Sequence, residues 1–428
     1  MTNINYYYSH NHTAALNPDN SPFEVVERKF RGHPDSLADM IAQSFAQKYI
    51  FEAWNIFPAL ERRYFPNFSA DKVTLAGASS SIENDKIIIK SPVSALLIGK
   101  ITQNIGGINM GVDSLFKTAI EDVMSICLHT NDYKQYITRQ IYSVNLAGVD
   151  RSSNFYNPTS ISDLITILQK ETFATSTVYV VAYAPLSITE KLSIFLDNFT
   201  NSPEFIQSFP AIGSDIKVLV RRKDSEFIIS LCLPVRPEII NTISGYNSVI
   251  KSATKTIEFA IVEFLKINGS IYAHPKIHMY VNTKDTKTKK YFAVWGTALS
   301  KGDIGAVGRG NRQQGFISGI RPSTNEAISG KNPQHFSGVI YQIVAENIAF
   351  EVFKKTGLKN VVYITANNGD PLDKPNLIDV LLEPNNGNSK AVINKIIMYT
   401  LANLDALRTD YILTNPVERF MRPKCYFL

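Results

Sequence analysis

Cysteine is scarce in this sequence, and long hydrophobic runs are missing. The 428 residues include three cysteines, Cys127, Cys232 and Cys425, which lie far apart and form no CxxC pair. An odd number of widely spaced cysteines argues against a zinc site, a redox dithiol or a disulfide-stapled fold, and it fits a reducing compartment. No segment approaches the roughly 20 apolar residues that a membrane span needs. We therefore expect a cytoplasmic protein without a membrane partner.

A strong excess of one charge is also missing. The chain has 44 basic and 38 acidic residues, a formal net charge of +6, and no dense block of lysine and arginine. This balance argues against a nucleic-acid partner. It is compatible with an anionic small molecule such as a polyphosphate.

The length predicts about three domains, at roughly 150 residues each. Runs of β-branched residues predict strands, and apolar positions at helical spacing predict helices. The expected strands cover residues 24–28, 72–77, 86–90, 136–146, 177–183, 216–220, 226–233, 278–281, 291–296, 361–365 and 377–382. The expected helices begin at Pro34 and after a Ser187–Glu190 capping box, and cover residues 112–123, 247–266, 338–355 and 391–408.

Strand pairs and helices thus recur about three times along the chain. This recurrence predicts an α+β protein of three similar sheet-plus-helix units. The approximate limits are 1–22 for a mobile N-terminal arm, 23–135 for an N-terminal unit, 136–270 for a central unit and 271–428 for a C-terminal unit. The arm is polar and tyrosine-rich, and it lacks the basic and apolar regions of a signal peptide.

The segment ERKFRGHPDSLAD, from Glu27 to Asp39, is the first candidate for chemistry. Its Gly-His-Pro-Asp turn opens a helix, whose N-terminus favours an anion. His33 could donate to a phosphate or to a leaving oxygen, and Asp35 could hold a divalent metal. The alternative is purely structural, with Asp35 capping the helix and His33 satisfied in a loop.

A second candidate is the glycine-rich segment from Gly302 to Lys331. A loop of this length within a compact chain is usually functional or disordered. Its glycines let backbone N–H groups approach a phosphate, and its positive charges are supplied by Arg309, Arg312, Arg321 and Lys331. The spacing does not fit a Walker A loop. A solvated, flexible loop is the alternative.

A third candidate is the pair Asp215 and Lys217, two residues apart on an expected strand and therefore on one face. Such a pair is more often a surface ion pair than a catalytic couple. The histidines outside the Gly-His-Pro-Asp turn show no metal-ligand spacing, and we expect them to be structural or exposed.

Taken together, these segments resemble S-adenosylmethionine synthetase (methionine adenosyltransferase), and specifically its archaeal-type branch. The resemblance covers roughly residues 23–395. Beyond the first segment, the similar segments are SPVSALLIGKIT, VVAYAPLSITEKL, FPAIGSDIKVLVRR, VNTKDTKTKKYFAVWGTALSKGDIGAVGRGNR, RPSTNEAISGKNP and NNGDPLDKPNLIDVLL.

The resemblance implies a fold of three pseudo-symmetric α+β units, interleaved in sequence, and a homodimer with active sites between the subunits. It implies a two-step reaction. The methionine sulfur attacks C5′ of ATP and displaces tripolyphosphate, which is then cleaved to pyrophosphate and phosphate. Mg²⁺ and K⁺ are the implied cofactors.

The resemblance also implies roles for individual residues. His33 would contact the leaving oxygen and the polyphosphate, Asp35 would bind magnesium, and Glu27 would lie near the nucleotide and the metal. Asp303 would meet the amino group of the amino-acid substrate. The residues expected on ATP or its polyphosphate are His33, Asp215, Lys217, Arg309, Arg312, Arg321 and Lys331.

Departures from the family pattern gather on the amino-acid side and in part of the phosphate hydrolysis site. Ser176 stands where the family has an acid near the substrate, and Ile304 replaces the second acid of the archaeal Gly-Asp-Asp-Gly. Phe336 takes the place of a histidine, which is shifted to His335, and Val339 replaces a lysine. A family His-His-Asn-Thr-Asp stretch is reduced to Asp71.

Three hypotheses follow from these matches and departures. The first is an active S-adenosylmethionine synthetase, which the intact set of His33, Asp35, Lys217, Arg309 and Lys331 favours. Alternatively, Ser176, Ile304 and Phe336 adapt the same ATP chemistry to a different amino-acid nucleophile. A third possibility is a pseudoenzyme subunit that pairs with an active synthetase.

Overall fold

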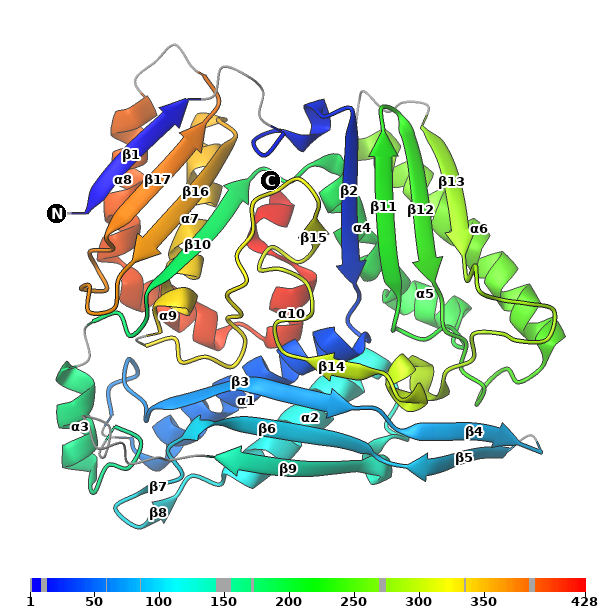
Figure 1. The fold of residues 1–428 in the computed structure, drawn as a ribbon, viewed down its shortest axis with the longest axis horizontal. Helices are drawn as coiled ribbons and strands as arrows, with labels where there is room; N and C mark the ends of the chain where they lie inside the picture. The colour runs from blue at the N-terminus through cyan, green and yellow to red at the C-terminus, as the bar shows by residue number, and fades with distance from the viewer. Residues whose placement is uncertain are drawn as a thin grey trace.

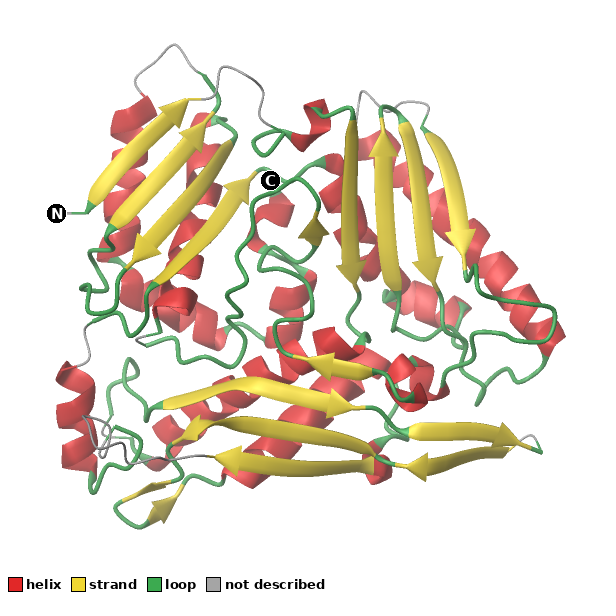
Figure 2. Cartoon of the chain, in the orientation of Figure 1, coloured by secondary structure: helices red, strands yellow, loops and turns green. Residues whose placement is uncertain are grey.

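The computed structural model describes residues 2–8, 14–58, 60–84, 86–143, 155–170, 173–268, 275–334, 336–384 and 389–428. Three β-sheets lie in front of a set of helices (Figure 1). Each sheet buries one face against its helices and leaves the other face open (Figure 2). The architecture confirms the expected α+β fold of three sheet-plus-helix units.

Sheet 1 contains the strands that follow the first long helix. Its order is β14-β3-β6-β9. Its strands are β3 (Phe68–Ala76), β6 (Val93–Ile101), β9 (Ile137–Ser143) and β14 (Ile304–Ala306). The helices α1 (Pro34–Ile56) and α2 (Val112–Leu128) cover it. Two hairpins extend from this unit: β4 (Ser79–Glu83) with β5 (Lys86–Ser91), and β7 (Asn104–Ile105) with β8 (Ile108–Asn109).

Sheet 2 has the order β13-β12-β11-β2-β15. Its strands are β2 (Phe23–Lys29), β11 (Lys217–Lys223), β12 (Glu226–Cys232), β13 (Lys276–Val281) and β15 (Ile317–Ser318). Alternate residues of these strands, such as Val26, Val218 and Ile229, are fully buried. They lie on the side of α4 (Ile188–Thr200) and α6 (Ile243–Asn268), and the short α5 (Pro203–Ser208) follows α4.

Sheet 3 has the order β1-β17-β16-β10. Its strands are β1 (Asn3–Tyr8), β10 (Val178–Ala184), β16 (Asn360–Ala366) and β17 (Leu377–Leu382). The helices α7 (Ser337–Thr356) and α8 (Ser389–Ala402) pack with this unit. The chain then continues through α9 (Leu404–Leu413) and α10 (Pro416–Met421), and α3 (Ile161–Lys170) lies beyond the end of sheet 1.

The units are interleaved in sequence, as expected. For this reason the sheets cross the expected limits at 135/136 and 270/271. β9, which follows residue 135, belongs to sheet 1 with β3 and β6, and β13, which follows residue 270, belongs to sheet 2. β2 and β10 likewise join sheets built mostly from later segments. Contiguous limits therefore do not describe this chain.

The expectation of a mobile N-terminal arm is wrong for the residues that form β1. This strand pairs in parallel with β17, from Asn3 opposite Leu377 to Tyr8 opposite Leu382. The Tyr6 hydroxyl donates to Asn394 Oδ1 at 2.6 Å. A tyrosine can pack its ring against the sheet while its hydroxyl forms a hydrogen bond. A tyrosine-rich segment of polar composition can therefore still form an edge strand of sheet 3. Residues 9–13 of the expected arm lie outside the described residues.

Most other local predictions are confirmed. The capping box is complete: Ser187 Oγ accepts from the Glu190 N–H at 3.1 Å, and Glu190 Oε2 accepts from the Ser187 N–H at 2.7 Å. The strand expected at 291–296 is wrong, because Val294–Gly296 is a 3₁₀ turn with Trp295 at φ 59°. The last expected helix is divided at Asn403 into α8 and α9. Within the described residues, no helix is long and apolar enough to cross a membrane.

We predict that Ser187→Ala lowers the free energy of unfolding by about 1–3 kcal/mol. The variant loses the cap of α4 and also the 2.6 Å hydrogen bond from Ser187 Oγ to the buried Glu24 carboxylate. Urea unfolding measures the change. Ser208→Ala is the matched control, because Ser208 is exposed and, among the described residues, its hydroxyl bonds only to Glu204 O of its own helix. Equal stability of the two variants would contradict the prediction.

Candidate active site

The candidate site lies where sheet 2 meets the start of α1. β2 ends at Lys29, opposite Lys217 at the start of β11, and a short turn leads from β2 to His33. Pro34 then opens α1, whose core-facing residues are buried in the molecule. The Gly-His-Pro-Asp motif is thus fixed between a central sheet strand and a buried helix.

His33 is the N-cap residue of α1, and its side chain is 14% exposed. Its Nδ1 accepts from the Asp35 N–H at 3.2 Å. Burial lowers the pKa of His33 to about 4, against the attraction of Asp35. The imidazole is therefore neutral near pH 7 and carries its proton on Nε2, which makes this atom a hydrogen-bond donor at the positive end of a helix.

Two lysine–carboxylate pairs flank His33. Lys29 Nζ lies 2.9 Å from Asp35 Oδ2, and Lys217 Nζ lies 3.1 Å from Glu27 Oε2. All four side chains are partly exposed. Sequence reasoning missed Lys29, although the alternation of β2 places Glu27 and Lys29 on one face. The pairs keep the site nearly neutral until an anion or a cation competes for one member.

The glycine-rich segment is held against α1 by two carboxylates. Asp35 Oδ1 accepts from the Ala306 N–H at 3.0 Å, and Asp39 Oδ1 accepts from the Gly308 N–H at 2.9 Å. At Gly305, an added Cβ would lie 2.0 Å from Pro34 O, so only glycine allows this approach. Burial raises the pKa of Asp39 to about 7. Asp39 was not among the expected site residues; its i, i+4 spacing from Asp35 was the available signal.

The segment places further expected residues beside His33. Asp303 is exposed and acts on the pKa of His33 through its charge, and its Oδ1 accepts from the Ile304 N–H at 2.9 Å. Arg309 is exposed, and its carbonyl oxygen accepts from Lys29 Nζ at 2.5 Å. The structure therefore brings together Glu27, His33, Asp35, Lys217, Asp303 and Arg309, which we call half-site 1.

Three other expected polyphosphate ligands are placed differently. Asp215 is buried, and its Oδ2 accepts from the Ala298 N–H at 2.6 Å and from Thr297 Oγ1 at 3.2 Å. Burial raises its pKa to about 7. Unlike Lys217, Asp215 does not lie on the open face of the sheet. It holds Thr297 and Ala298, which precede the glycine-rich segment.

The two remaining arginines also have partners within the chain, and the polyphosphate roles expected of them stay predictions. The Arg321 guanidinium is buried and binds both oxygens of Glu190, at 2.9 and 3.1 Å. It also donates to carbonyl oxygens such as Pro185 O and lies over the Tyr183 ring. Arg312 lines a small cavity, together with other residues of the glycine-rich segment and with Asp39, Gln43, Arg419 and Phe420. A family-type arginine in a glycine-rich loop can serve the fold rather than the ligand, and sequence alone does not separate the two roles.

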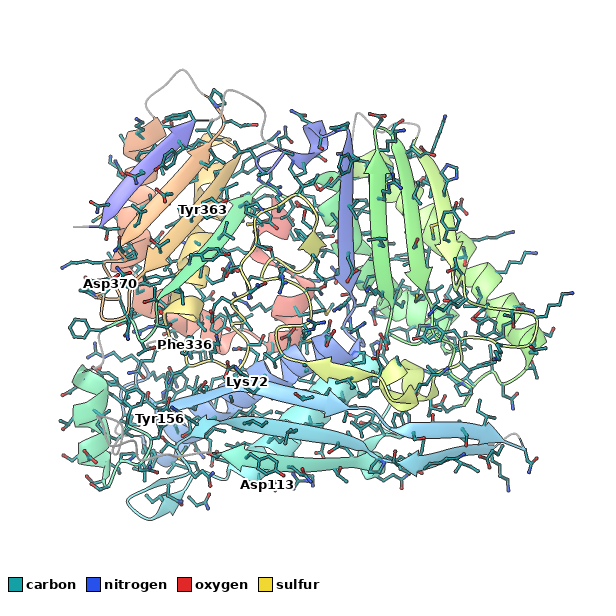
Figure 3. The ribbon with its side chains drawn as sticks, viewed as in Figure 1. Lys72, Asp113, Tyr156, Phe336, Tyr363 and Asp370 are labelled. Carbon is teal, nitrogen blue, oxygen red and sulfur yellow. The ribbon has the colours of Figure 1, made fainter. Side chains whose placement is uncertain are left out.

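A second group of expected residues lies at the start of α7, and we call it half-site 2. Ser176 Oγ is 2.7 Å from Ser337 Oγ, which donates to Ser176 O at 2.8 Å. Lys331 is buried, is ion-paired with Glu326, and lies 4.5 Å from the centre of the Phe336 ring. Figure 3 shows Phe336 between the start of α7 and β3.

The two half-sites are separated within one chain. Lys331 is bridged to Ser69 at one end of β3, whereas Ile304 pairs with Ala76 at the other end. Seven residues of strand span about 23 Å. Val339 is fully buried in the core and does not line half-site 2. His335 lies outside the described residues.

A metal at this site needs ligands from elsewhere. No group of three or more His, Cys, Asp or Glu side chains suited to a metal occurs among the described residues. Mg²⁺ is commonly bound by one or two carboxylates together with substrate phosphates and water. The partly exposed carboxylates of Asp35 and Glu27 fit that pattern.

We predict that Asp39→Asn reduces the loss of stability between pH 5 and pH 8. The raised pKa means that folded Asp39 holds its proton more tightly than the unfolded chain does, so folding weakens as the pH rises toward 7. The effect is on the order of 2 kcal/mol. Urea unfolding at both pH values measures it for the variant and the wild type.

Asp39 is one of several buried carboxyl groups with a raised pKa. Burial also raises the pKa values of Glu24 and Asp215 to about 7, so these groups share the same pH range. Only the difference between the two proteins isolates Asp39. Parallel pH profiles for the variant and the wild type would refute the role given to this carboxyl.

Known proteins with a similar sequence and fold identify the family. Residues 10–415 match the family model of S-adenosylmethionine synthetase (AdoMet synthetase). An S-adenosylmethionine synthase of Methanococcus aeolicus is 30% identical over 415 residues, covering 93% of this chain and 96% of that protein. One from Thermococcus onnurineus is 31% identical over 390 residues, covering 89% of each.

A solved structure shows the same fold at lower identity. It is described as an unusual S-adenosylmethionine synthetase from Campylobacter jejuni, with a TM-score of 0.55, 13% identity, and coverage of 93% of this chain and 97% of that one. The archaeal sequence relatives agree with the archaeal-type resemblance. This chain therefore belongs to the S-adenosylmethionine synthetase family.

Proposed function

We propose that the protein synthesises S-adenosylmethionine from ATP and methionine and cleaves the tripolyphosphate to pyrophosphate and phosphate. One observation carries this proposal for the chain itself. A neutral His33 with its proton on Nε2 lies between Lys29 and Lys217, at the positive end of α1. A helix N-terminus with lysines on both sides is suited to a polyphosphate.

The chemistry explains why such a group is needed. Attack of the methionine sulfur on C5′ breaks the C5′–O5′ bond and leaves both electrons on the tripolyphosphate. Donors that already point at the developing charge stabilise the transition state. His33 Nε2–H would donate to the leaving oxygen, and Lys217 and Arg309 would bind the phosphates.

The lysine–carboxylate pairs suggest how binding begins. On arrival of the anion, Lys29 and Lys217 would exchange their carboxylate partners for phosphate oxygens, which releases Asp35 and Glu27 for a cation. Mg²⁺, held by these carboxylates and the phosphates, would supply further neutralisation of the leaving group. K⁺ is the second cation that the family resemblance implies, and we propose no ligands for it.

We propose a homodimer in which half-site 1 of one subunit meets half-site 2 of the other. Both half-sites contain groups suited to ATP or methionine, yet Lys331 of half-site 2 and Ile304, next to Asp303 of half-site 1, pair with opposite ends of β3, about 23 Å apart along the strand. The open sheet faces carry apolar side chains that favour a protein interface. These side chains, 39–59% exposed, are Tyr7, Phe23, Ile98, Tyr142, Tyr179, Leu219, Tyr280 and Ile304.

The cysteines support a cytoplasmic location as part of the proposal. Cys127 and Cys425 are buried as free thiols, and Cys232 is exposed and also free. Free cysteines are typical of a reducing compartment.

We predict that Lys217→Met lowers kcat/KM for S-adenosylmethionine formation by about 10²–10³-fold, because a cation at the developing phosphate charge is lost. Mass spectrometry of the adenosyl product measures the rate. Lys223→Met is the matched control: Lys223 lies on the same face of β11, six residues further from His33. Equal losses in both variants would contradict the assignment of Lys217.

We predict that two inactive variants restore activity when they are mixed. In a Lys217→Met subunit half-site 1 is damaged, and in a Lys331→Gln subunit half-site 2 is damaged. A mixed dimer contains one composite site without either change, so random exchange restores about a quarter of wild-type activity. The measurement is product formation after unfolding and refolding the mixture. If each active site belonged to one chain, mixing would restore nothing.

A further inference from the structure

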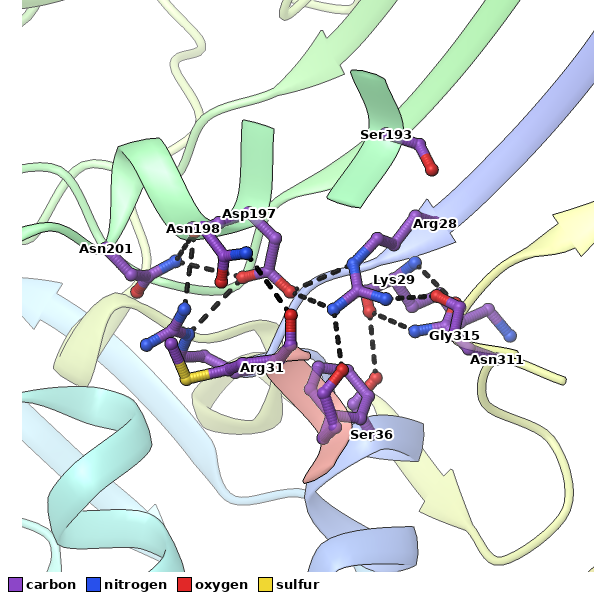
Figure 4. Close-up of polar contacts among 12 residues, drawn as sticks. Arg28, Lys29, Arg31, Ser36, Ser193, Asp197, Asn198, Asn201, Asn311 and Gly315 are labelled. Carbon is purple, nitrogen blue, oxygen red and sulfur yellow. Dashed lines mark hydrogen bonds and ion pairs between the residues drawn. The ribbon is translucent and has the colours of Figure 1, made fainter. Parts of the chain in front are cut away.

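A buried charge network lies directly behind half-site 1. Arg28, between Glu27 and Lys29 on β2, points to the opposite face of the sheet and is fully buried. Its Nε and Nη2 bind Asp197 Oδ2 of α4 at 3.1 and 2.7 Å (Figure 4). Arg31, two residues before His33, lies 3.3 Å from Asp197 Oδ1. One carboxylate therefore holds both ends of the segment that leads to His33.

The same arginine reaches the glycine-rich segment. Arg28 Nη1 donates to the carbonyl oxygen of Gly315. Gly315 has φ +93°, and an added Cβ would lie 2.6 Å from Pro423 Cγ and 2.8 Å from Arg28 Nη1. The middle of the segment, at Gly315, is thus enclosed between Arg28 and the C-terminal residues, while its first part is held by Asp35 and Asp39.

The C-terminal segment completes the enclosure. Arg28 Nη2 donates to Phe420 O at 3.1 Å, and its guanidinium lies 4.7 Å from the centre of the Phe420 ring. Asn198 of α4 donates to Met421 O at 3.2 Å. Asn415 caps α10 by accepting from the Val417 and Glu418 N–H groups. Residues 416–428, which form these contacts, follow the stretch that matches the family model.

We propose that Arg28 is a positioning residue that joins β2, the glycine-rich segment and α10 into one rigid unit. The C-terminal segment thereby controls where Arg309 and the loop N–H groups lie relative to His33. The planar guanidinium uses all three of its nitrogens, on a carboxylate, two carbonyl oxygens and one ring, and a lysine ammonium cannot reproduce this set. The catalytic consequence rests on the proposed function, whereas the ordering of the loop does not.

The experiment compares Arg28→Lys with Arg222→Lys. Both arginines are buried in sheet 2 and face a carboxylate and carbonyl oxygens, with side chains 0% and 2% exposed. Arg222 pairs with Glu24, which precedes Arg28 by four residues on β2 and therefore lies further from His33. Phe420→Ala removes the ring, and Phe420→Tyr restores it. For each variant we would measure Tm, kcat and KM for ATP, and amide hydrogen exchange across residues 304–318.

Arg28→Lys and Phe420→Ala are expected to lower kcat/KM by about 10–100-fold, as for a misplaced catalytic group, and to raise amide exchange in residues 304–318. Arg222→Lys is expected to lower Tm by a similar amount with less than about a threefold loss of kcat/KM. Phe420→Tyr should return both readouts toward wild type. The proposal would be overturned if the Arg28 and Arg222 variants lost kcat/KM to the same extent for the same decrease in Tm.

Amide exchange separates this proposal from the proposed function. A wild-type protein that forms no adenosyl product would refute the function and leave the exchange comparison intact. Unchanged exchange in residues 304–318 of Arg28→Lys would refute the positioning role even in an active enzyme.

Discussion

The first turns of α1 join chain segments that lie about 270 residues apart, and the site depends on this junction. Asp35 and Asp39, one helical turn apart, accept from the N–H groups of Ala306 and Gly308, while His33 caps the same helix. Since α1 is largely buried, its position is fixed by the core. The histidine and the glycine-rich segment therefore have a common rigid reference, and Arg28 extends that reference to the C-terminal segment.

Charge is balanced differently on the two sides of β2. On the open face, lysines and carboxylates form partly exposed pairs, which an incoming anion and cation can separate at small cost. On the covered face, Asp197 holds two arginines in a buried network, where the loss of one partner is far more costly. In half-site 2 the departures from the family are satisfied locally: Ser176 bonds to Ser337, and Phe336 lies against Lys331. Because Ser176 and Phe336 have partners within the chain, their presence does not favour an amino-acid nucleophile other than methionine.

Much of the fold could be predicted from the sequence, because its signals are local. Helix starts are indicated by Pro34 and by the Ser187–Glu190 capping box, and strands are indicated by runs of β-branched residues. These signals depend on neighbouring residues in the sequence and not on tertiary contacts. β1 was missed because a tyrosine-rich strand at a sheet edge reads as polar, and β14 was missed because a three-residue strand carries no periodicity. The site was predictable where the resemblance gave motifs, as for His33 and Lys217. The roles of Arg321 and Asp215 depend on long-range partners that no local pattern reveals, and so does the separation of the two half-sites. For Asp39 the i, i+4 spacing from Asp35 was the one local signal.

Product analysis of one incubation tests the central claim most directly. The purified protein is incubated with ATP, Mg²⁺, K⁺ and methionine, and the adenosyl and phosphate products are quantified by mass spectrometry. The account predicts S-adenosylmethionine together with equal amounts of pyrophosphate and phosphate. S-adenosylmethionine with intact tripolyphosphate would limit the protein to the first step. The absence of any adenosyl product would contradict the account.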